Sequence, residues 1–190
     1  MKLALGVPLA PFLDDDFSLL RGTLDDVHWT PQLNSHLILR LLGNINARPL
    51  LDDIDYELRK LVWEPFSIHF QQVYHRPGSH DDRLVTCPSP SDPLSQLQRN
   101  VEKRLRAATC APVRQRFHPE TTLGYVSPGR ETDIIPWIQR HNLFKSQPLV
   151  VDRLELVELF GQHETLSCHA VEAYGCYGQA LPLPAFNEVF

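Results

Sequence analysis

Two short segments of this 190-residue chain carry side chains that could transfer protons and bind an anion. In the first, residues 34–42, His36 and Arg40 lie within an apolar stretch. Alternate residues of a strand share a face, so we expect His36, Ile38 and Arg40 on one side of it. The other side, facing the core, would carry three leucines: Leu37, Leu39 and Leu41. This pattern predicts a cleft wall, and an exposed sheet face with an incidental histidine is the alternative.

The second segment, residues 116–125, repeats the alternation with more polar side chains. One face would carry a cation, an imidazole, a carboxylate and a hydroxyl group: Arg116, His118, Glu120 and Thr122. The opposite face would carry Phe117, Thr121, Leu123 and Tyr125. An imidazole and a carboxylate can act as acid and base, and a guanidinium group can bind phosphate. An ordinary solvent-exposed strand face is again the alternative.

The elements that must position these segments predict an α+β protein. Alternation and turn residues predict strands at residues 3–9, 34–42, 66–73, 83–87, 121–126, 149–160 and 166–177. Helical spacing predicts helices at residues 14–24, from Pro49, after the N-cap Ser91, and from Thr132 to Trp137. Four basic residues of the third helix are expected on a solvated face: Arg99, Lys103, Arg104 and Arg106. Short hairpin-like links favour α+β over a doubly wound parallel sheet.

The composition excludes several classes of protein. With 43% apolar and 22% charged residues the chain can bury a core, so it is not disordered or collagenous. No apolar run approaches the roughly 20 residues of a membrane span, and the N-terminus reads as a first strand rather than a signal peptide. Four cysteines without zinc-like spacing predict reduced thiols and a cytoplasmic location. A net charge of −5 argues against binding long duplex nucleic acid, but permits a pocket for one phosphate.

The two segments resemble the signatures of the 2H phosphoesterase superfamily. His36-Leu37-Ile38-Leu39-Arg40-Leu41-Leu42-Gly43 is similar to the first signature, "HLTLRFLG", and residues 117–124, FHPETTLG, are similar to the second, "FxPHxTLG". Their spacing is similar to that of the bacterial 2′-5′ RNA ligase and RNA 2′,3′-cyclic phosphodiesterase branch, and the resemblance extends over nearly the whole chain.

The resemblance implies a bilobal fold, in which two pseudo-symmetric antiparallel sheets flank a central cleft and the helices lie outside. It implies one domain, residues 1–190, made of two lobes without a linker. It also implies a hydrolase that needs no metal and no cofactor and acts on the cyclic phosphate of an RNA terminus or a nucleotide. His36 and Glu120 would then face each other across the cleft.

Both signatures are altered in this chain. Ile38 stands where the first signature has Thr or Ser, and Glu120 stands where the second has His. Because a carboxylate can act as the base in place of the second histidine, we expect His36 as acid and Glu120 as base, with Thr122 as the hydroxyl group that the second signature supplies. Phosphate-binding roles would fall to Arg40, Arg116 and His118.

Two other functions remain open from the sequence. One is a lapsed 2H protein that binds a nucleotide or RNA-end phosphate without turnover. The other is an enzyme for a different phosphodiester, in which Ile38 makes room for an apolar group. A literal match to the signature at residues 163–166, HETL, comes too late in the chain and is interpreted as a coincidence.

Overall fold

The computed structural model describes residues 1–22, 24–30, 36–78, 82–111, 116–127, 131–161 and 167–183. Its strands are β1 (Lys2–Pro8), β2 (Val27–Trp29), β3 (His36–Asn44), β4 (Phe66–Ile68), β5 (Phe70–Arg76), β6 (Arg83–Pro88), β7 (Thr121–Val126), β8 (Leu149–Val151), β9 (Arg153–Phe160) and β10 (Ser167–Gly175). Its helices are α1 (Asp14–Ser18), α2 (Arg48–Leu58), α3 (Asp92–Ala107) and α4 (Glu131–Arg140). The predicted α+β class is therefore confirmed. The sequence match at residues 163–166 lies outside the described residues.

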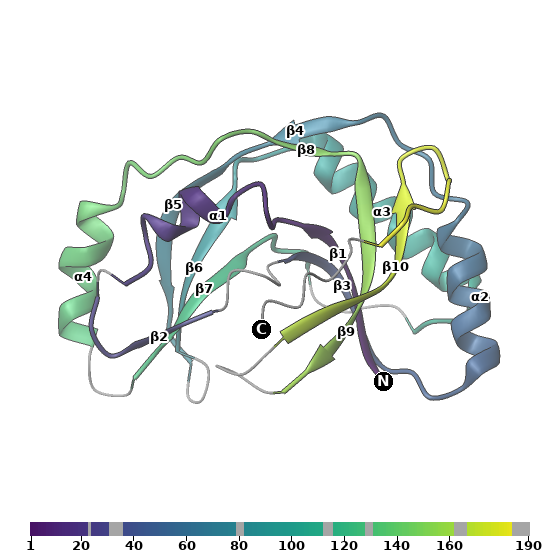
Figure 1. Cartoon of the computed structure of the whole chain (residues 1–190), viewed down its shortest axis with the longest axis horizontal. Coiled ribbons are helices and arrows are strands. Elements are labelled where there is room, and N and C mark those ends of the chain that lie inside the picture. The colour runs from purple at the N-terminus through teal and green to yellow at the C-terminus, as the bar shows by residue number, and fades with distance from the viewer. Residues whose placement is uncertain are drawn as a thin grey trace.

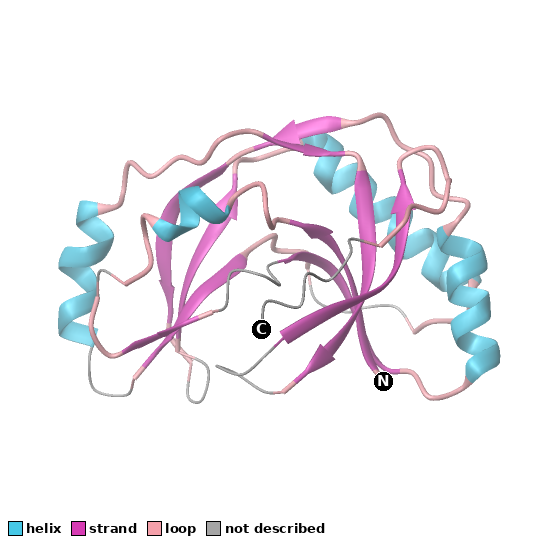
Figure 2. Cartoon of the chain, viewed as in Figure 1, coloured by secondary structure: helices cyan, strands magenta, loops and turns pink. Residues whose placement is uncertain are grey.

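The strands form two four-stranded antiparallel sheets (Figure 1). Sheet A has the order β10-β9-β1-β3, and sheet B has the order β2-β7-β6-β5. A short pair, β4–β8, bridges them, because β4 leads into β5 of sheet B and β8 leads into β9 of sheet A. Figure 2 shows α2 and α3 at the outside beside sheet A, and α4 at the outside beside sheet B.

Helix α3 illustrates how local sequence builds the outer layer. The side chain of Ser91 accepts a hydrogen bond from the backbone N–H of Leu94, which confirms the predicted N-cap. An apolar stripe at helical spacing is buried in the main core, together with Leu37 of β3: Leu94, Leu97, Val101 and Leu105. We call the side of sheet A that faces this core its outer face. The inner face carries a separate small cluster of Ala4, Val157 and Cys168.

Several element boundaries differ from the sequence prediction. Helix α1 ends at Ser18 instead of continuing to residue 24, and Gly22 then adopts a left-handed φ of 71°. The predicted strands at 66–73 and 149–160 each divide in two, because their first halves leave the main sheets to form the β4–β8 bridge. Helix α4 extends to Arg140, past Pro136, beyond its predicted end.

A β-bulge interrupts each strand that carries a signature-like segment. In β3, Ile38 lies opposite Gly6 and Arg40 lies opposite Leu5, which leaves Leu39 as the extra residue. In β7, Thr122 lies opposite Val85 and Gly124 lies opposite Leu84, which leaves Leu123 as the extra residue. Both bulged leucines are buried in the main core. The two segments thus share a bulge at the same motif position.

The bulges correct the predicted faces. Residues directly opposite in an antiparallel pair point to the same side, so Arg40 shares the outer face with Leu5 rather than the inner face with Ile38. Leu41, predicted in the core, lies opposite Ala4 on the inner face and is 51% exposed. In β7 the bulge turns Tyr125 to the face of Thr122 instead of the face of Leu123.

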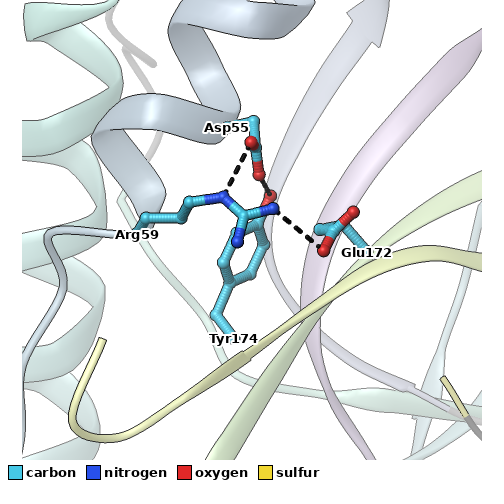
Figure 3. A network of polar contacts seen from close by, with 4 residues as sticks. All are labelled: Asp55, Arg59, Glu172 and Tyr174. Carbon is cyan, nitrogen blue, oxygen red and sulfur yellow. Dashed lines mark hydrogen bonds and ion pairs between the residues drawn. The ribbon is translucent and has the colours of Figure 1, made fainter. Parts of the chain in front are cut away.

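A polar network fastens α2 to β10 (Figure 3). Arg59 donates to Oδ2 of Asp55 at 2.8 Å and to Oε1 of Glu172 at 3.1 Å, while the buried Tyr174 hydroxyl donates to Oδ1 of Asp55 at 3.1 Å. Burial, followed by the nearby Asp55 carboxylate, strongly raises the pKa of Tyr174. This network holds the helix layer against the sheet. None of the helices in the described residues has the length and apolar character needed to cross a membrane.

Candidate active site

His36 lies at the start of β3, on the inner face of sheet A. It is paired with Pro8 of β1, two residues from Gly6. A Cβ atom at Gly6 would lie 2.9 Å from the Leu37 carbonyl oxygen and 3.3 Å from the Cβ of His36. The absence of a side chain at Gly6 therefore allows β1 to approach β3 closely beneath the histidine.

The imidazole of His36 is held by a buried carboxylate. Its Nε2 lies 2.9 Å from Oε2 of Glu155 on β9, and the two side chains are only 7% and 4% exposed. Arg153, two residues earlier on the same strand, lies 3.0 Å from the other oxygen of Glu155. The result is a row of alternating charge, Arg153–Glu155–His36, across the inner face.

This environment favours the protonated imidazole. Burial alone would lower the pKa of His36, but hydrogen bonding to Cys168 and Glu155, together with their charges, outweighs it and raises the pKa to about 9. At neutral pH, His36 is therefore an imidazolium ion. Such a group can donate a proton to a leaving oxygen or attract a phosphate, but it cannot accept a proton as a base.

Glu120 lies just before β7, in a separate polar cluster formed with sheet B. Its Oε2 accepts a hydrogen bond from Nε of Arg76 at 2.9 Å, and its Oε1 lies 3.4 Å from Nη2 of Arg83. The other terminal nitrogen of Arg83 donates to the hydroxyl of Thr122 at 3.3 Å. Arg76 and Arg83 lie opposite each other on β5 and β6, so they present two guanidinium groups to one carboxylate.

The two clusters belong to strands that contact each other, β3 and β7. His36 and Glu120 occupy corresponding places: His36 is the first residue of β3, and Glu120 directly precedes the first residue of β7. Together they offer an acid, a carboxylate, a hydroxyl and two guanidinium groups. This set can bind a phosphate and transfer protons around it.

The remaining predicted residues lie elsewhere. Arg40, 8% exposed on the outer face, donates through Nη2 to the carbonyl oxygen of Ala111, and its Nε lies 3.4 Å from Oε1 of Glu102 on α3. Its predicted place on the face of His36 is therefore wrong. Arg40, Arg116 and His118 together line a pocket of about 810 Å³ beside α3. The structure thus separates these three side chains from the contacts of His36 and Glu120.

A family comparison identifies the chain. The family described as the 2′-5′ RNA ligase superfamily matches residues 30–162, which is more than half of the sequence and includes both segments. The chain belongs to the 2′-5′ RNA ligase superfamily. As a member of this superfamily of 2H phosphoesterases, it has the fold that its two signature-like segments suggest.

Solved structures of low sequence identity share the fold of this superfamily member. E. coli LigT complexed with 3′-AMP is 14% identical with a TM-score of 0.70, covering 92% of this chain and 97% of that chain. TT0787 of Thermus thermophilus is 15% identical with a TM-score of 0.69, covering 94% and 100%. The PDE domain of MHV ns2 is 16% identical with a TM-score of 0.58, covering 83% and 99%. A search of curated proteins finds no match to the sequence.

Sequence reasoning missed the residues that surround the two candidate catalytic groups. Glu155 and Arg153 come from β9, more than 110 positions after His36, and only the sheet order reveals the contact. A signal existed, because Arg153 and Glu155 alternate with Leu154 and Leu156 at the start of β9. Arg76 and Arg83 at the strand ends gave no comparable signal.

Proposed function

We propose that this protein is a metal-independent phosphodiesterase that hydrolyses 2′,3′-cyclic phosphates at RNA ends or on nucleotides. The observation that supports the proposal best is the buried His36–Glu155 pair, 2.9 Å between Nε2 and Oε2. Together with the hydrogen bond to Cys168, this pair raises the pKa of an imidazole in the signature-like segment of a chain from the 2H phosphoesterase superfamily. LigT is known in complexes with 3′-AMP and with ATP, which supports a nucleotide-type ligand here.

The proposed reaction needs one acid and one base. Glu120 accepts a proton from a water molecule, whose oxygen forms a bond to phosphorus. The bond from phosphorus to one ribose oxygen breaks, and the protonated His36 gives its proton to that oxygen. Thr122 and Arg83 stabilise the phosphoryl oxygens, where negative charge accumulates. Glu155 and Arg153 position the imidazole and do not touch the substrate.

The experiment that tests the proposal is turnover of a panel of 2′,3′-cyclic nucleotides and RNA ends. We expect activity in the unaltered protein, with His36→Ala and Glu120→Gln each lowering the rate by about 10²–10⁴-fold, the usual contribution of an acid or base. The double variant Glu120→His/Ile38→Thr restores both signature residues and should raise the rate. If this variant folds and no cyclic phosphate is turned over, the assignment of the site to these two segments is wrong.

A second candidate function is phosphate binding without turnover. It is favoured by one observation, the contact of Glu120 with both Arg76 and Arg83. A phosphate could replace this carboxylate as the anion bound by the two guanidinium groups. In that case Glu120 would not activate water. Calorimetry with a cyclic nucleotide, run beside the turnover assay, separates the two functions, because a binding protein gives heat of binding but no product.

A further inference from the structure

The pocket beside α3 carries a concentration of positive charge. It is lined by five cationic side chains: Arg40, Arg99, Lys103, Arg106 and Arg116. Among the described residues that line it, the one carboxylate, Glu102, forms an ion pair with Arg40. The pocket thus has an excess of positive charge in a chain whose net charge is −5.

Helix α3 directs these charges into the pocket by its periodicity. Arg99, Lys103 and Arg106 are spaced by three and four positions, so they lie along one face of the helix. Arg104 points instead toward α2, where it contacts Glu57 at 3.5 Å and the Lys60 carbonyl at 3.3 Å. The predicted solvated face of four basic residues therefore divides into three that line the pocket and one that joins two helices.

Three of the cations are available to a ligand. Lys103, Arg106 and Arg116 are exposed, and within the described part of the chain none of them forms an ion pair. Phe117, partly buried, adds an aromatic wall next to them. Cationic side chains combined with an aromatic surface are characteristic of grooves that bind single-stranded nucleic acid.

The pocket adjoins the candidate active site along two segments of the chain. Ile38 lines it and is two residues after His36, and His118 lines it and is two residues before Glu120. Two residues span at most about 7 Å of chain. Along α3, Arg99 and Arg106 are separated by seven residues, or about 10 Å of helix. A nucleic-acid strand whose end lies at His36 and Glu120 could therefore continue into the pocket. The row of cations along α3 is longer than a single phosphate group.

We propose that this pocket binds the backbone phosphates of a single-stranded oligoribonucleotide whose end occupies the candidate active site. The inference rests on the proposed function, and it narrows the substrate class from any cyclic nucleotide to an RNA end. Guanidinium groups suit this role because they form paired hydrogen bonds to phosphate oxygens. Lys103 contributes a point charge, and Arg40 holds Glu102 so that it does not repel the ligand.

The test measures binding of a fluorescently labelled hexaribonucleotide with a linear 3′-phosphate, so that no turnover is needed. Fluorescence anisotropy at 50 to 200 mM salt compares the unaltered protein with Lys103→Gln/Arg106→Gln. Loss of two phosphate contacts should weaken binding about tenfold at low salt and reduce the slope of log K against log salt by about 1.4. The matched control Arg104→Gln/Arg140→Gln removes two charges outside the pocket and should bind like the unaltered protein.

Each result decides the matter. If the pocket variant binds like its control, or if 3′-AMP binds as tightly as the hexanucleotide, the oligonucleotide site is wrong. Circular dichroism of each variant checks that it is folded. Failure of the proposed function is recognised separately, by the absence of turnover of a cyclic mononucleotide. A protein that turns over the mononucleotide but shows no pocket effect overturns only this inference.

Discussion

Nε2 of His36 lies 2.9 Å from Oε2 of Glu155, and both side chains are almost completely buried. A buried ion pair is costly to form but also costly to break, because removing one partner leaves an uncompensated charge. Arg153 at 3.0 Å completes the row and balances the charge of Glu155. The site is therefore built to hold a charged imidazole in one position.

Glu155→Gln should remove the main carboxylate partner of His36. We expect the pKa of His36 to fall from about 9 toward its usual value near 6.5, because burial then acts with less opposition. We also expect a loss of about 3 kcal/mol in stability, since Arg153 and His36 would lose their shared anion. NMR titration of the His36 ring and urea unfolding measure the two effects.

The control for this variant is Glu158→Gln on the same strand. Glu158 lies opposite Leu3, on the outer face of sheet A. Its substitution by Gln removes the same charge as Glu155→Gln does, but away from His36. An unchanged His36 titration in Glu158→Gln, beside a lowered one in Glu155→Gln, would establish the contact. Equal titrations in both variants would show that Glu155 does not hold the proton.

Stability should depend on pH through His36. Its pKa is about 9 in the folded chain and about 6.5 when unfolded, so the folded state binds the proton more tightly. This contribution is fully present below pH 6.5 and is lost as the pH rises to about 9, a change of about 3 kcal/mol. Urea unfolding at pH 6 to 9 should show the decline, and His36→Gln should make the curve flatter in this interval.

Gly6→Ala should disturb the site without altering any polar group. The added Cβ would lie 2.9 Å from the backbone oxygen of Leu37, which cannot move aside as a flexible side chain could, and 3.3 Å from the Cβ of His36. We expect a loss of about 1–3 kcal/mol in unfolding free energy and a lower pKa for His36, as β1 and β3 move apart. A variant with unchanged stability and unchanged His36 titration would contradict the close approach of these strands.

Much of the fold could be predicted from local patterns. The Ser91 cap and the stripe through Val101 specify α3, and alternation around His36 and Thr122 specifies β3 and β7. The bulges could not be predicted, because an extra residue at Leu39 or Leu123 is defined only by the register with β1 or β6. For that reason the alternation rule misplaced the side chains after each bulge.

The sequence points to the candidate site residues but not to the side chains that contact them. His36, Glu120 and Thr122 follow from the two signature-like segments, while their partners come from strands remote in sequence. A single chain does not disclose that β9 lies two strands from β3, since the sheet order is set by the packing of the whole molecule. Arg40 was displaced from the site by one bulged residue.

Tyr174→Phe should test how much the polar network between α2 and β10 contributes to stability, independently of the candidate active site. The hydroxyl donates to Asp55 at 3.1 Å within the network of Figure 3, so its loss leaves a carboxylate oxygen without that donor. We expect a loss of about 1 kcal/mol in stability and no change in turnover. The control is Tyr177→Phe, which also removes one hydroxyl group, but from a ring that is 69% exposed. Equal stability of the two variants would contradict a role for the Tyr174 hydroxyl.

Glu120→Gln distinguishes an enzyme from a binding protein by the direction of its effect. If Glu120 is the base, the rate on a 2′,3′-cyclic nucleotide should fall by about 10²–10⁴-fold, because the amide cannot accept the proton of water. If the protein only binds, the same change should strengthen binding, since it removes a negative charge from the phosphate site and releases Arg76 and Arg83 for the ligand. Glu64→Gln, at an exposed position, serves as the control for both measurements. A Glu120→Gln variant with unaltered rate and unaltered affinity would remove Glu120 from the site altogether.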